Sequence, residues 1–138
     1  MLRLNKSLKL VIVTVLILNG ASCTKPAGPG GRATVKGKVY AYDFDNTQRY
    51  IVSKGYSSAE NVYICYGNNS VVGNDVKTST DGSFEFRYLN KGHYKVFVNS
   101  VDTAIKVKGN NTKIPVIKEF DITATSQTID LGDITINK

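Results

Sequence analysis

Apolar and polar residues alternate one by one along most of the chain after residue 32. Turn residues interrupt this alternation at intervals of about eight to twelve positions. A period of two places every second side chain on the same face of a β-strand, whereas a helix needs apolar residues three and four positions apart. The helical spacing does not persist over three turns anywhere after residue 23. The pattern therefore predicts an all-β protein, a single β-sandwich of about seven short strands.

Each alternating run predicts one strand with an inward and an outward face, as in the first run, where Val35, Val39 and Ala41 are expected inward. Strands are expected at residues 33–42, 61–66, 75–80, 83–88, 94–98, 104–108, 114–122 and 127–138, with a further short edge strand at 49–52. In the last run, Ile129 and Leu131 lie in the opposite phase to Ile134 and Ile136. A bulge at Gly132, which adds one residue, would return both pairs to the same face.

The run TSTDGSFEFRYLNKGHYKVFV, residues 78–98, contains two turn signals. Asp81-Gly82 is typical of a tight turn in which glycine supplies a positive φ, so the sequence predicts a β-hairpin that joins 75–80 to 83–88. Phe84 and Phe86 are expected to face the core. A second turn at residues 90–92 is expected to lead into a strand with Tyr94 inward.

The N-terminus has the features of a secretory signal peptide, residues 1–22. Three basic residues precede the apolar run 10–18, which is shorter than the roughly 20 residues that a membrane-spanning helix needs. The sequence Gly20-Ala21-Ser22-Cys23 resembles the lipobox of bacterial lipoproteins, in which the cysteine is acylated on sulfur and becomes the new N-terminus. Acylation of Cys23 would hold the chain on a bilayer. The alternative is an ordinary secreted protein cut near Ala21, with Cys23 free.

The next segment, 23–32, is rich in glycine and proline and is expected to be a flexible linker between the acylated Cys23 and a domain at 33–138. Some lipoproteins carry an acidic cluster here that resembles a surface-export signal, and this chain has no acid before Asp43. We therefore expect a lipid-anchored protein of the bacterial outer membrane that faces the periplasm.

The net charge and the cysteine content limit which macromolecules the chain can bind and whether it can form a disulfide. Removing the signal peptide removes three of the eighteen basic residues, and fifteen basic against eleven acidic residues leave a formal charge of +4. No basic cluster suggests a nucleic-acid track, so nucleic acid is not an expected partner. If Cys23 carries lipid, Cys65 has no partner for a disulfide and is expected to be a buried, unreactive thiol.

Four short motifs occur in order between residues 33 and 101. They are GKV at 37–39, NVYI at 61–64, T-x-x-D-G-x-F at 78–84 and L-x-x-G-x-Y-x-V at 89–96. This series resembles the carboxypeptidase regulatory-like domain, although the long insertion at 43–60 departs from it. The resemblance implies a prealbumin-like sandwich that acts as an accessory domain, beside peptidase domains, before outer-membrane receptor barrels, or alone in small lipoproteins. Fold alone implies no activity.

Catalytic and metal-binding patterns are weak. His93 is the only histidine, and its outward phase beside Lys95 predicts a solvent-facing residue without an orienting acid. The sequence Asp43-Phe44-Asp45-Asn46 has alternating oxygen ligands as a calcium loop does, but the later glycine and glutamate of such a loop are missing. We therefore expect no enzyme, no metal and no cofactor.

Tyrosine is concentrated in one part of the chain, with six of the eight tyrosines between Tyr40 and Tyr66. Tyr40, Tyr42 and Tyr63 lie opposite the core phase and are the candidate ligand-binding residues, because exposed rings can stack on sugars or contact a protein. Alternatively, the insertion at 43–60 folds over these tyrosines.

Three functions remain for the chain. The leading hypothesis is a non-catalytic, membrane-anchored structural or protein-interaction module. The second is a glycan-binding accessory protein, and the weakest is an enzyme.

Overall fold

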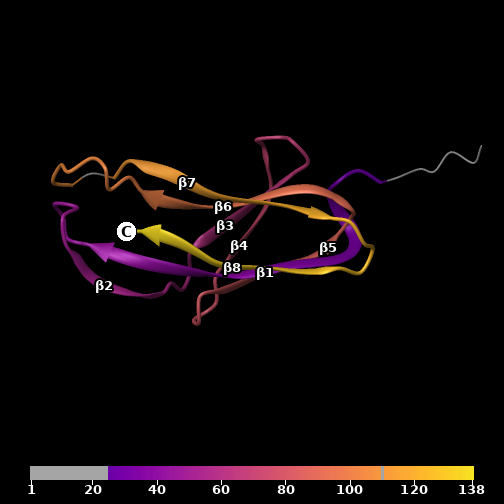
Figure 1. Cartoon of the computed structure of the whole chain (residues 1–138), viewed down its shortest axis with the longest axis horizontal. Helices are drawn as coiled ribbons and strands as arrows, with labels where there is room; N and C mark the ends of the chain where they lie inside the picture. Colours follow the sequence, from indigo (N-terminus) through magenta and orange to yellow (C-terminus); the bar gives the residue numbers. More distant parts are fainter. Residues whose placement is uncertain (1–24, 110) are drawn as a thin grey trace, which may run out of the picture.

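The computed structural model describes residues 25–109 and 111–138, and these form eight strands and no helix (Figure 1). The strands are β1 Pro29–Phe44, β2 Ile51–Tyr56, β3 Asn61–Tyr66, β4 Val72–Lys77, β5 Ser83–Leu89, β6 Gly92–Val101, β7 Lys113–Ile122 and β8 Thr128–Asn137. They build two stacked four-stranded sheets, so the predicted all-β sandwich is confirmed. The signal peptide and Cys23 lie outside the described residues.

The first sheet, called the β1 sheet, is arranged around the long strand β1. Strand β8 runs parallel to β1 on one side, with Val35 opposite Ile129 and Ala41 opposite Ile136. On the other side β5 and β2 follow one another along β1, both antiparallel to it. Val39 marks their junction, because its N–H donates to the Gly82 carbonyl and its carbonyl accepts from the Ser57 N–H, each at 2.9 Å.

The second sheet, called the β6 sheet, has the order β4-β3-β6-β7 and is antiparallel throughout. Tyr63 lies opposite Phe97, and Phe97 lies opposite Ile117, so one row of side chains crosses three strands. Pro115 lies in the edge strand β7, where a missing backbone donor costs least.

The core lies between the sheets and contains the side chains of the inward phase. Its buried members are Ala33, Val35, Val39, Ala41, Val62, Ile64, Phe84, Phe86, Leu89, Tyr94, Val96, Val98, Ile122, Ile134 and Ile136. The predicted inward phases of β1, β3, β5 and β6 are therefore confirmed. The predicted bulge is also present, because Lys36 pairs with Asp130 whereas Lys38 pairs with Asp133, and Gly132 has φ of 64°.

The predicted hairpin of residues 75–88 is wrong. Strand β4 pairs with β3 in the β6 sheet, whereas β5 pairs with β1 in the other sheet. The Asp81-Gly82 turn therefore carries the chain from one sheet to the other, and the turn before Gly92 carries it back. Alternation correctly predicted that Phe84 and Phe86 of β5 face the core, but it did not reveal which strand β5 pairs with.

Other boundaries differ from the prediction. Strand β4 begins and ends three residues earlier than expected, because Thr78 is buried and its hydroxyl donates to the Ser57 carbonyl at 2.6 Å. Residues 104–108 form turns and no strand, and the edge strand expected at 49–52 is β2. No helix within the described part of the chain is long and apolar enough to cross a membrane.

The linker expected at residues 23–32 is partly integrated into the sandwich. Strand β1 begins at Pro29, and Gly28 is buried. The Gly28 N–H donates to the Tyr94 hydroxyl at 2.9 Å, and the Gly28 carbonyl accepts from the Asn90 N–H at 2.9 Å. The domain therefore starts earlier than residue 33, because two polar partners hold this glycine against the core.

Candidate functional site

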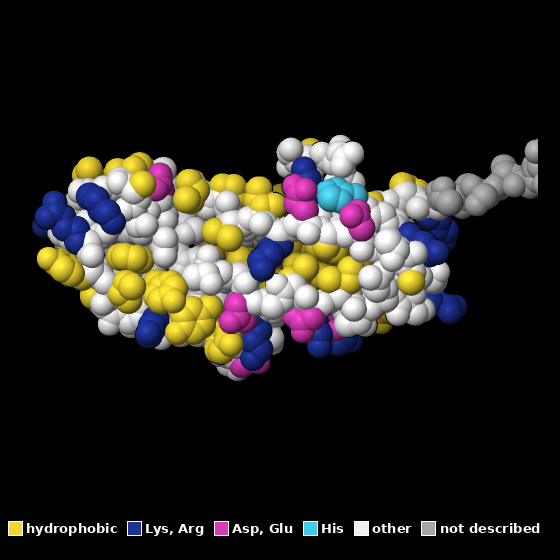
Figure 2. Space-filling view, viewed as in Figure 1, with side chains coloured by type: hydrophobic (Ala, Val, Ile, Leu, Met, Phe, Trp, Pro, Cys, Tyr) yellow, Lys and Arg dark blue, Asp and Glu magenta, His cyan; other side chains and the backbone are white. Residues whose placement is uncertain are grey.

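The most distinctive surface of the described residues is the outer side of the β1 sheet, which we call the β1 face. Its members are Lys36, Lys38, Tyr40 and Tyr42 of β1, Lys54 and Tyr56 of β2, Ser83 and Glu85 of β5, Asp130 and Asp133 of β8, and Asp81 of the preceding turn. Figure 2 shows hydrophobic side chains gathered over β1 and β2 at the lower left, with charged side chains beside them toward β8 and β5. The β1 face therefore has an aromatic half and a charged half, which lie next to each other along β1.

Three tyrosines form the aromatic half. The Tyr40 ring lies 5.5 Å from the Tyr42 ring and 5.3 Å from the Tyr56 ring, both edge to face. Tyr40 and Tyr42 are half-buried, and Tyr56 is 49% exposed. Register explains the cluster, because Tyr40 of β1 lies directly opposite Tyr56 of β2. The rings are therefore fixed by strand pairing, edge to face rather than coplanar, so they present separate ring faces and no single flat platform.

Lys38 joins the two halves of the face. Its ammonium lies 4.7 Å from the centre of the Tyr56 ring and donates to Asp81 Oδ2 at 3.1 Å. On the other side of the ring system, the Tyr56 hydroxyl donates to Asp133 Oδ2 at 3.4 Å. The lysine and the two carboxylates thus surround the exposed tyrosine with polar groups.

Asp81 is held in place by its turn. Gly82 has φ of 76°, and a Cβ there would lie 2.8 Å from the Val39 carbonyl oxygen, so only glycine lets the turn lie against β1. The Asp81 carboxylate accepts hydrogen bonds from the Ser83 hydroxyl, Lys38 and the Ser83 N–H, which lower its pKa to about 2. The hydrogen bond to Asp81 in turn raises the pKa of Lys38. The pair therefore stays charged at neutral pH.

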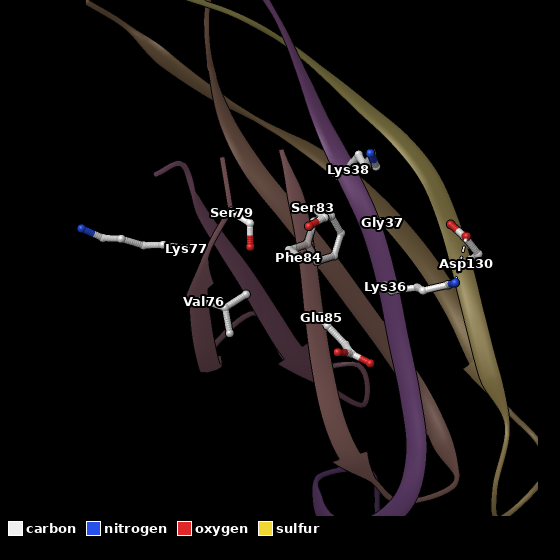
Figure 3. A pocket seen from close by; sticks show the side chains of 10 residues that line it. All are labelled: Lys36, Gly37, Lys38, Val76, Lys77, Ser79, Ser83, Phe84, Glu85 and Asp130. Atoms are coloured by element: carbon white, nitrogen blue, oxygen red, sulfur yellow. Dashed lines mark ion pairs between the residues drawn. The ribbon is translucent and has the colours of Figure 1, made fainter. Parts of the chain in front are cut away.

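The charged half continues into a hollow of about 590 Å³ between β4 and β5, where the two sheets meet without pairing. Figure 3 shows Val76 and Ser79 on one side of the hollow, Phe84 and Glu85 on the other, and Lys36 reaching toward Asp130. The Lys36–Asp130 pair spans 3.7 Å. The hollow is lined by charges of both signs, so it offers hydrogen bonding without a strong net field.

The structure separates the three predicted tyrosines. Tyr63 lies on the outer side of the β6 sheet, where its ring stacks on Phe97 at 5.0 Å and 21°. Tyr40 and Tyr42 lie on the other sheet, so the three residues cannot form one site. Cys65 shares the outward phase of Tyr63 but is 3% exposed, and it lines a hollow of about 280 Å³ together with Asn69 and Ser70. The expectation of a buried thiol is confirmed.

The interpretation of His93 as a residue without an orienting acid is wrong. Its Nδ1 lies 2.9 Å from Asp121 Oδ1 and its Nε2 lies 3.7 Å from Glu119 Oε2. Both acids belong to β7, and Asp121 lies directly opposite His93 in the register. The sequence distance between the strands concealed this contact. Lys95 also pairs with Glu119, at 3.7 Å, so His93 belongs to a surface cluster of polar and charged side chains.

The Asp43–Asn46 segment is built as a structural turn. Asp45 accepts hydrogen bonds from the Thr47 hydroxyl and from the backbone N–H groups of Thr47, Arg49 and Tyr50, which hold its pKa well below the usual range. Its oxygens are thus used by local donors. Within residues 25–109 and 111–138, no group of three or more His, Cys, Asp or Glu side chains is placed to hold a metal ion.

Sequence reasoning missed Tyr56, Asp81 and Asp133 as parts of the site. Tyr56 was visible as a tyrosine, but only the β1–β2 register places it beside Tyr40. Asp133 reaches the same ring through the parallel pairing of β8 with β1, a contact between segments far apart in the chain. The Asp81-Gly82 turn was recognised, but its approach to Lys38 depends on the sheet crossing.

No protein-family model and no curated protein matches the chain. One solved structure with a similar fold comes from Pseudomonas aeruginosa and is described as a candidate carbohydrate binding protein. It is 12% identical, with a TM-score of 0.45, and the match covers 85% of this chain and 93% of that chain. At this level of similarity the match does not bear on the ligand of this chain.

Proposed function

We propose that this chain is a non-catalytic binding module of the cell envelope, held at a membrane by acylated Cys23, and that its β1 face binds a polysaccharide. The observation that carries the proposal is the cluster of Tyr40, Tyr42 and Tyr56 beside a row of paired charges on a rigid sheet. Aromatic rings take the apolar faces of sugars, and neighbouring carboxylates and hydroxyls accept and donate hydrogen bonds to sugar hydroxyls.

The charge pattern favours a neutral polysaccharide over a charged polymer. Lys36 pairs with Asp130, Lys38 pairs with Asp81, and Glu85 pairs with Arg87 at 2.6 Å. Because each of these charges has a partner on the face itself, a polyanion would have to displace an existing carboxylate. A ligand with many hydroxyl groups can instead bind across the pairs without separating them.

Removing the Tyr40 or Tyr42 ring is expected to weaken binding to a neutral polysaccharide at least tenfold, which is about 1.4 kcal/mol. Tyr40→Ala and Tyr42→Ala would each remove one ring of the cluster, and Tyr56→Ala would remove the exposed one. Saturable binding would be measured by isothermal titration calorimetry and affinity electrophoresis against a panel of neutral polysaccharides.

The matched control is Tyr63→Ala, which removes the same ring from the opposite sheet and is expected to leave binding unchanged. Tyr40→Phe keeps the ring and separates stacking from the hydroxyl. Thermal unfolding of each variant would show that the fold persists. If no neutral polysaccharide binds saturably, or if Tyr63→Ala weakens binding as much as Tyr40→Ala, the β1 face is not the site.

Replacing Cys23 is expected to release the protein from the membrane. In Cys23→Ser no thiol is available for acylation, so the N-terminal peptide should lack the acyl mass, and the protein cut near Ala21 should move from the membrane fraction to the soluble fraction. Fractionation and intact mass of the N-terminal peptide would measure this. Cys65→Ala is the matched control and should keep the acyl mass. An unmodified Cys23 in the wild-type protein would contradict the anchor while leaving the polysaccharide proposal open.

A protein partner is the second candidate function, and the outer side of the β6 sheet favours it. Tyr63 and Phe97 stack there, Ile117 beside them is 50% exposed, and Pro115 follows in the edge strand β7. Such an apolar row with a shallow hollow next to it suits the aromatic anchors of a protein interface. Under this reading Tyr63→Ala, and not Tyr40→Ala, would abolish crosslinking to the partner in cells.

A further inference from the structure

Two loops meet at one end of the long axis, and we call this surface the distal loops, residues 45–52 and 102–109. Figure 1 shows the β1–β2 and β6–β7 connections together at the left, opposite the start of β1. Lys106 Nζ donates to the Gln48 carbonyl at 2.7 Å, and the Gly109 N–H donates to the Asn46 carbonyl at 3.0 Å. The two loops are therefore joined into one surface, and buried Gln48 fixes the first of them.

Large apolar side chains project from both loops. Tyr50 is 71% exposed, Val52 66% and Val107 61%, and Ile51 and Ile105 are also exposed. Five large apolar side chains exposed at one end are unusual for a soluble surface, where such residues are normally scattered singly. Ile51 and Val52 stand at the start of β2 and the other three on the loops, and none of the five belongs to the buried core, so their exposure needs another explanation.

Positive charge surrounds these apolar side chains. Arg49, Lys106, Lys108 and Lys113 all belong to the two loops or the start of β7, and none of them forms an ion pair within the described residues. Three acids lie in or beside the same loops. Asp45 caps backbone N–H groups, Asp43 accepts from the Ser53 hydroxyl at 2.5 Å, and Asp102 accepts from the Ala104 N–H at 2.9 Å. These donors are neutral, so the three acids keep their charge and the four cations exceed them by one. Figure 2 shows the basic side chains grouped at this end of the molecule.

We propose that the distal loops dock on an anionic lipid surface, with Tyr50, Val52 and Val107 entering the interface and the basic side chains contacting lipid phosphates. Apolar side chains that project from a surface, with cations around them, match the composition of segments that lie in a membrane interface. Tyrosine is typical of that interface, because its ring is apolar and its hydroxyl stays hydrated.

A bilayer fits this surface better than a soluble polyanion does. A sulfated or phosphorylated polymer would use the cations but would leave Val52 and Val107 in water, so their exposure would remain unexplained. A lipid surface uses both features, since buried apolar area and attraction to anionic headgroups add in interfacial binding. The proposal is also independent of the β1 face and of Cys23, because neither contributes a residue to the distal loops.

The first test uses residues 25–138, which contain all eight strands and the whole buried core but no acylated cysteine. We expect this protein to sediment with vesicles of phosphatidylcholine that contain about one third phosphatidylglycerol, and not with pure phosphatidylcholine. Arg49→Gln combined with Lys108→Gln should weaken this binding about 20- to 30-fold, since each cation near an anionic surface contributes about fivefold. Lys77→Gln combined with Lys91→Gln removes the same charge elsewhere and should change binding less than about twofold.

The second test reports insertion directly. The chain contains no tryptophan, so Tyr50→Trp introduces a single fluorescent reporter at the distal loops. We expect its emission to shift to shorter wavelength with anionic vesicles and to be quenched by brominated acyl chains. Tyr88→Trp is the matched control, because Tyr88 is 68% exposed on β5, away from the distal loops, and its emission should not change.

Three results would overturn the proposal. The first is the absence of binding to anionic vesicles by a correctly folded protein, as shown by its cooperative thermal unfolding. The second is binding without any change in the emission of Tyr50→Trp, which would mean electrostatic attraction only. The third is equally tight binding to dextran sulfate that competes with the vesicles, which would identify the distal loops as a polyanion site.

Discussion

Ile134→Ala is expected to lower the free energy of unfolding by about 3–4 kcal/mol. Ile134 has no exposed surface, and it lies on the edge strand β8 opposite Val39 of the central strand β1. Truncation removes buried methyl groups and leaves a cavity that two hydrogen-bonded sheets cannot easily close. Urea unfolding followed by circular dichroism would measure the change.

The matched control for this prediction is Ile114→Ala on β7. Ile114 is the same residue type in a strand of the other sheet, but it is 44% exposed, so the expected change is within about 0.5 kcal/mol. Similar losses in the two variants would mean that β8 does not pack against the core as described. That outcome would also question the parallel pairing that brings Asp133 to the β1 face.

Gly31→Ala is expected to cost about 3 kcal/mol or more, because the new methyl group has no space. A Cβ at Gly31 would overlap the carbonyl oxygen of Leu89, which belongs to the backbone of β5 and cannot rotate away. Relieving the overlap requires the start of β1 to separate from the end of β5. Thermal unfolding and hydrogen exchange at the Asn90 N–H, which donates to Gly28, would report this separation.

Gly55→Ala provides the comparison for Gly31→Ala. Gly55 also lies in a strand of the β1 sheet, and a Cβ there would meet no atom within 4 Å. Replacing it by alanine is expected to leave stability unchanged or raise it slightly, because the unfolded chain loses freedom. If Gly31→Ala were tolerated equally well, the segment before Ala33 would be a free linker, as its composition suggested.

Local patterns predicted what each strand buries, because burial depends on the side chain and its neighbours in the chain. The alternation in β1 correctly identified Val35, Val39 and Ala41 as core residues, and the odd phase of Ile134 correctly indicated the bulge at Gly132. Turn chemistry also located Asp81-Gly82. These features are determined within a few residues, so one sequence is sufficient to find them.

Pairing between strands could not be predicted in the same way. A turn of two residues is common in hairpins, yet the turn at Asp81-Gly82 crosses between sheets, because β5 finds its partner in β1 rather than in β4. The predicted ligand-binding residues were wrongly grouped for the same reason. Tyr40 and Tyr63 have the same phase relative to the core but lie on different sheets, so phase alone grouped two residues that the fold separates.

The strand predicted at residues 104–108 was wrong, because the alternating apolar side chains there are exposed. Ile105 and Val107 alternate with lysines as a half-buried strand would, but both side chains are exposed and the Val107 N–H donates to the Ile105 carbonyl. Alternation indicates a strand only when a core exists for the apolar face. Here the apolar side chains of the alternating run face solvent, as part of the distal loops.

The early start of β1 determines how the molecule could stand at a bilayer. With Gly28 fixed by Tyr94 and Asn90, about four residues follow Cys23 before the sandwich begins, a reach of roughly 13–14 Å. Strand β1 alone extends over about 50 Å. A protein acylated at Cys23 would therefore have to lie on its side for both of its ends to meet one bilayer.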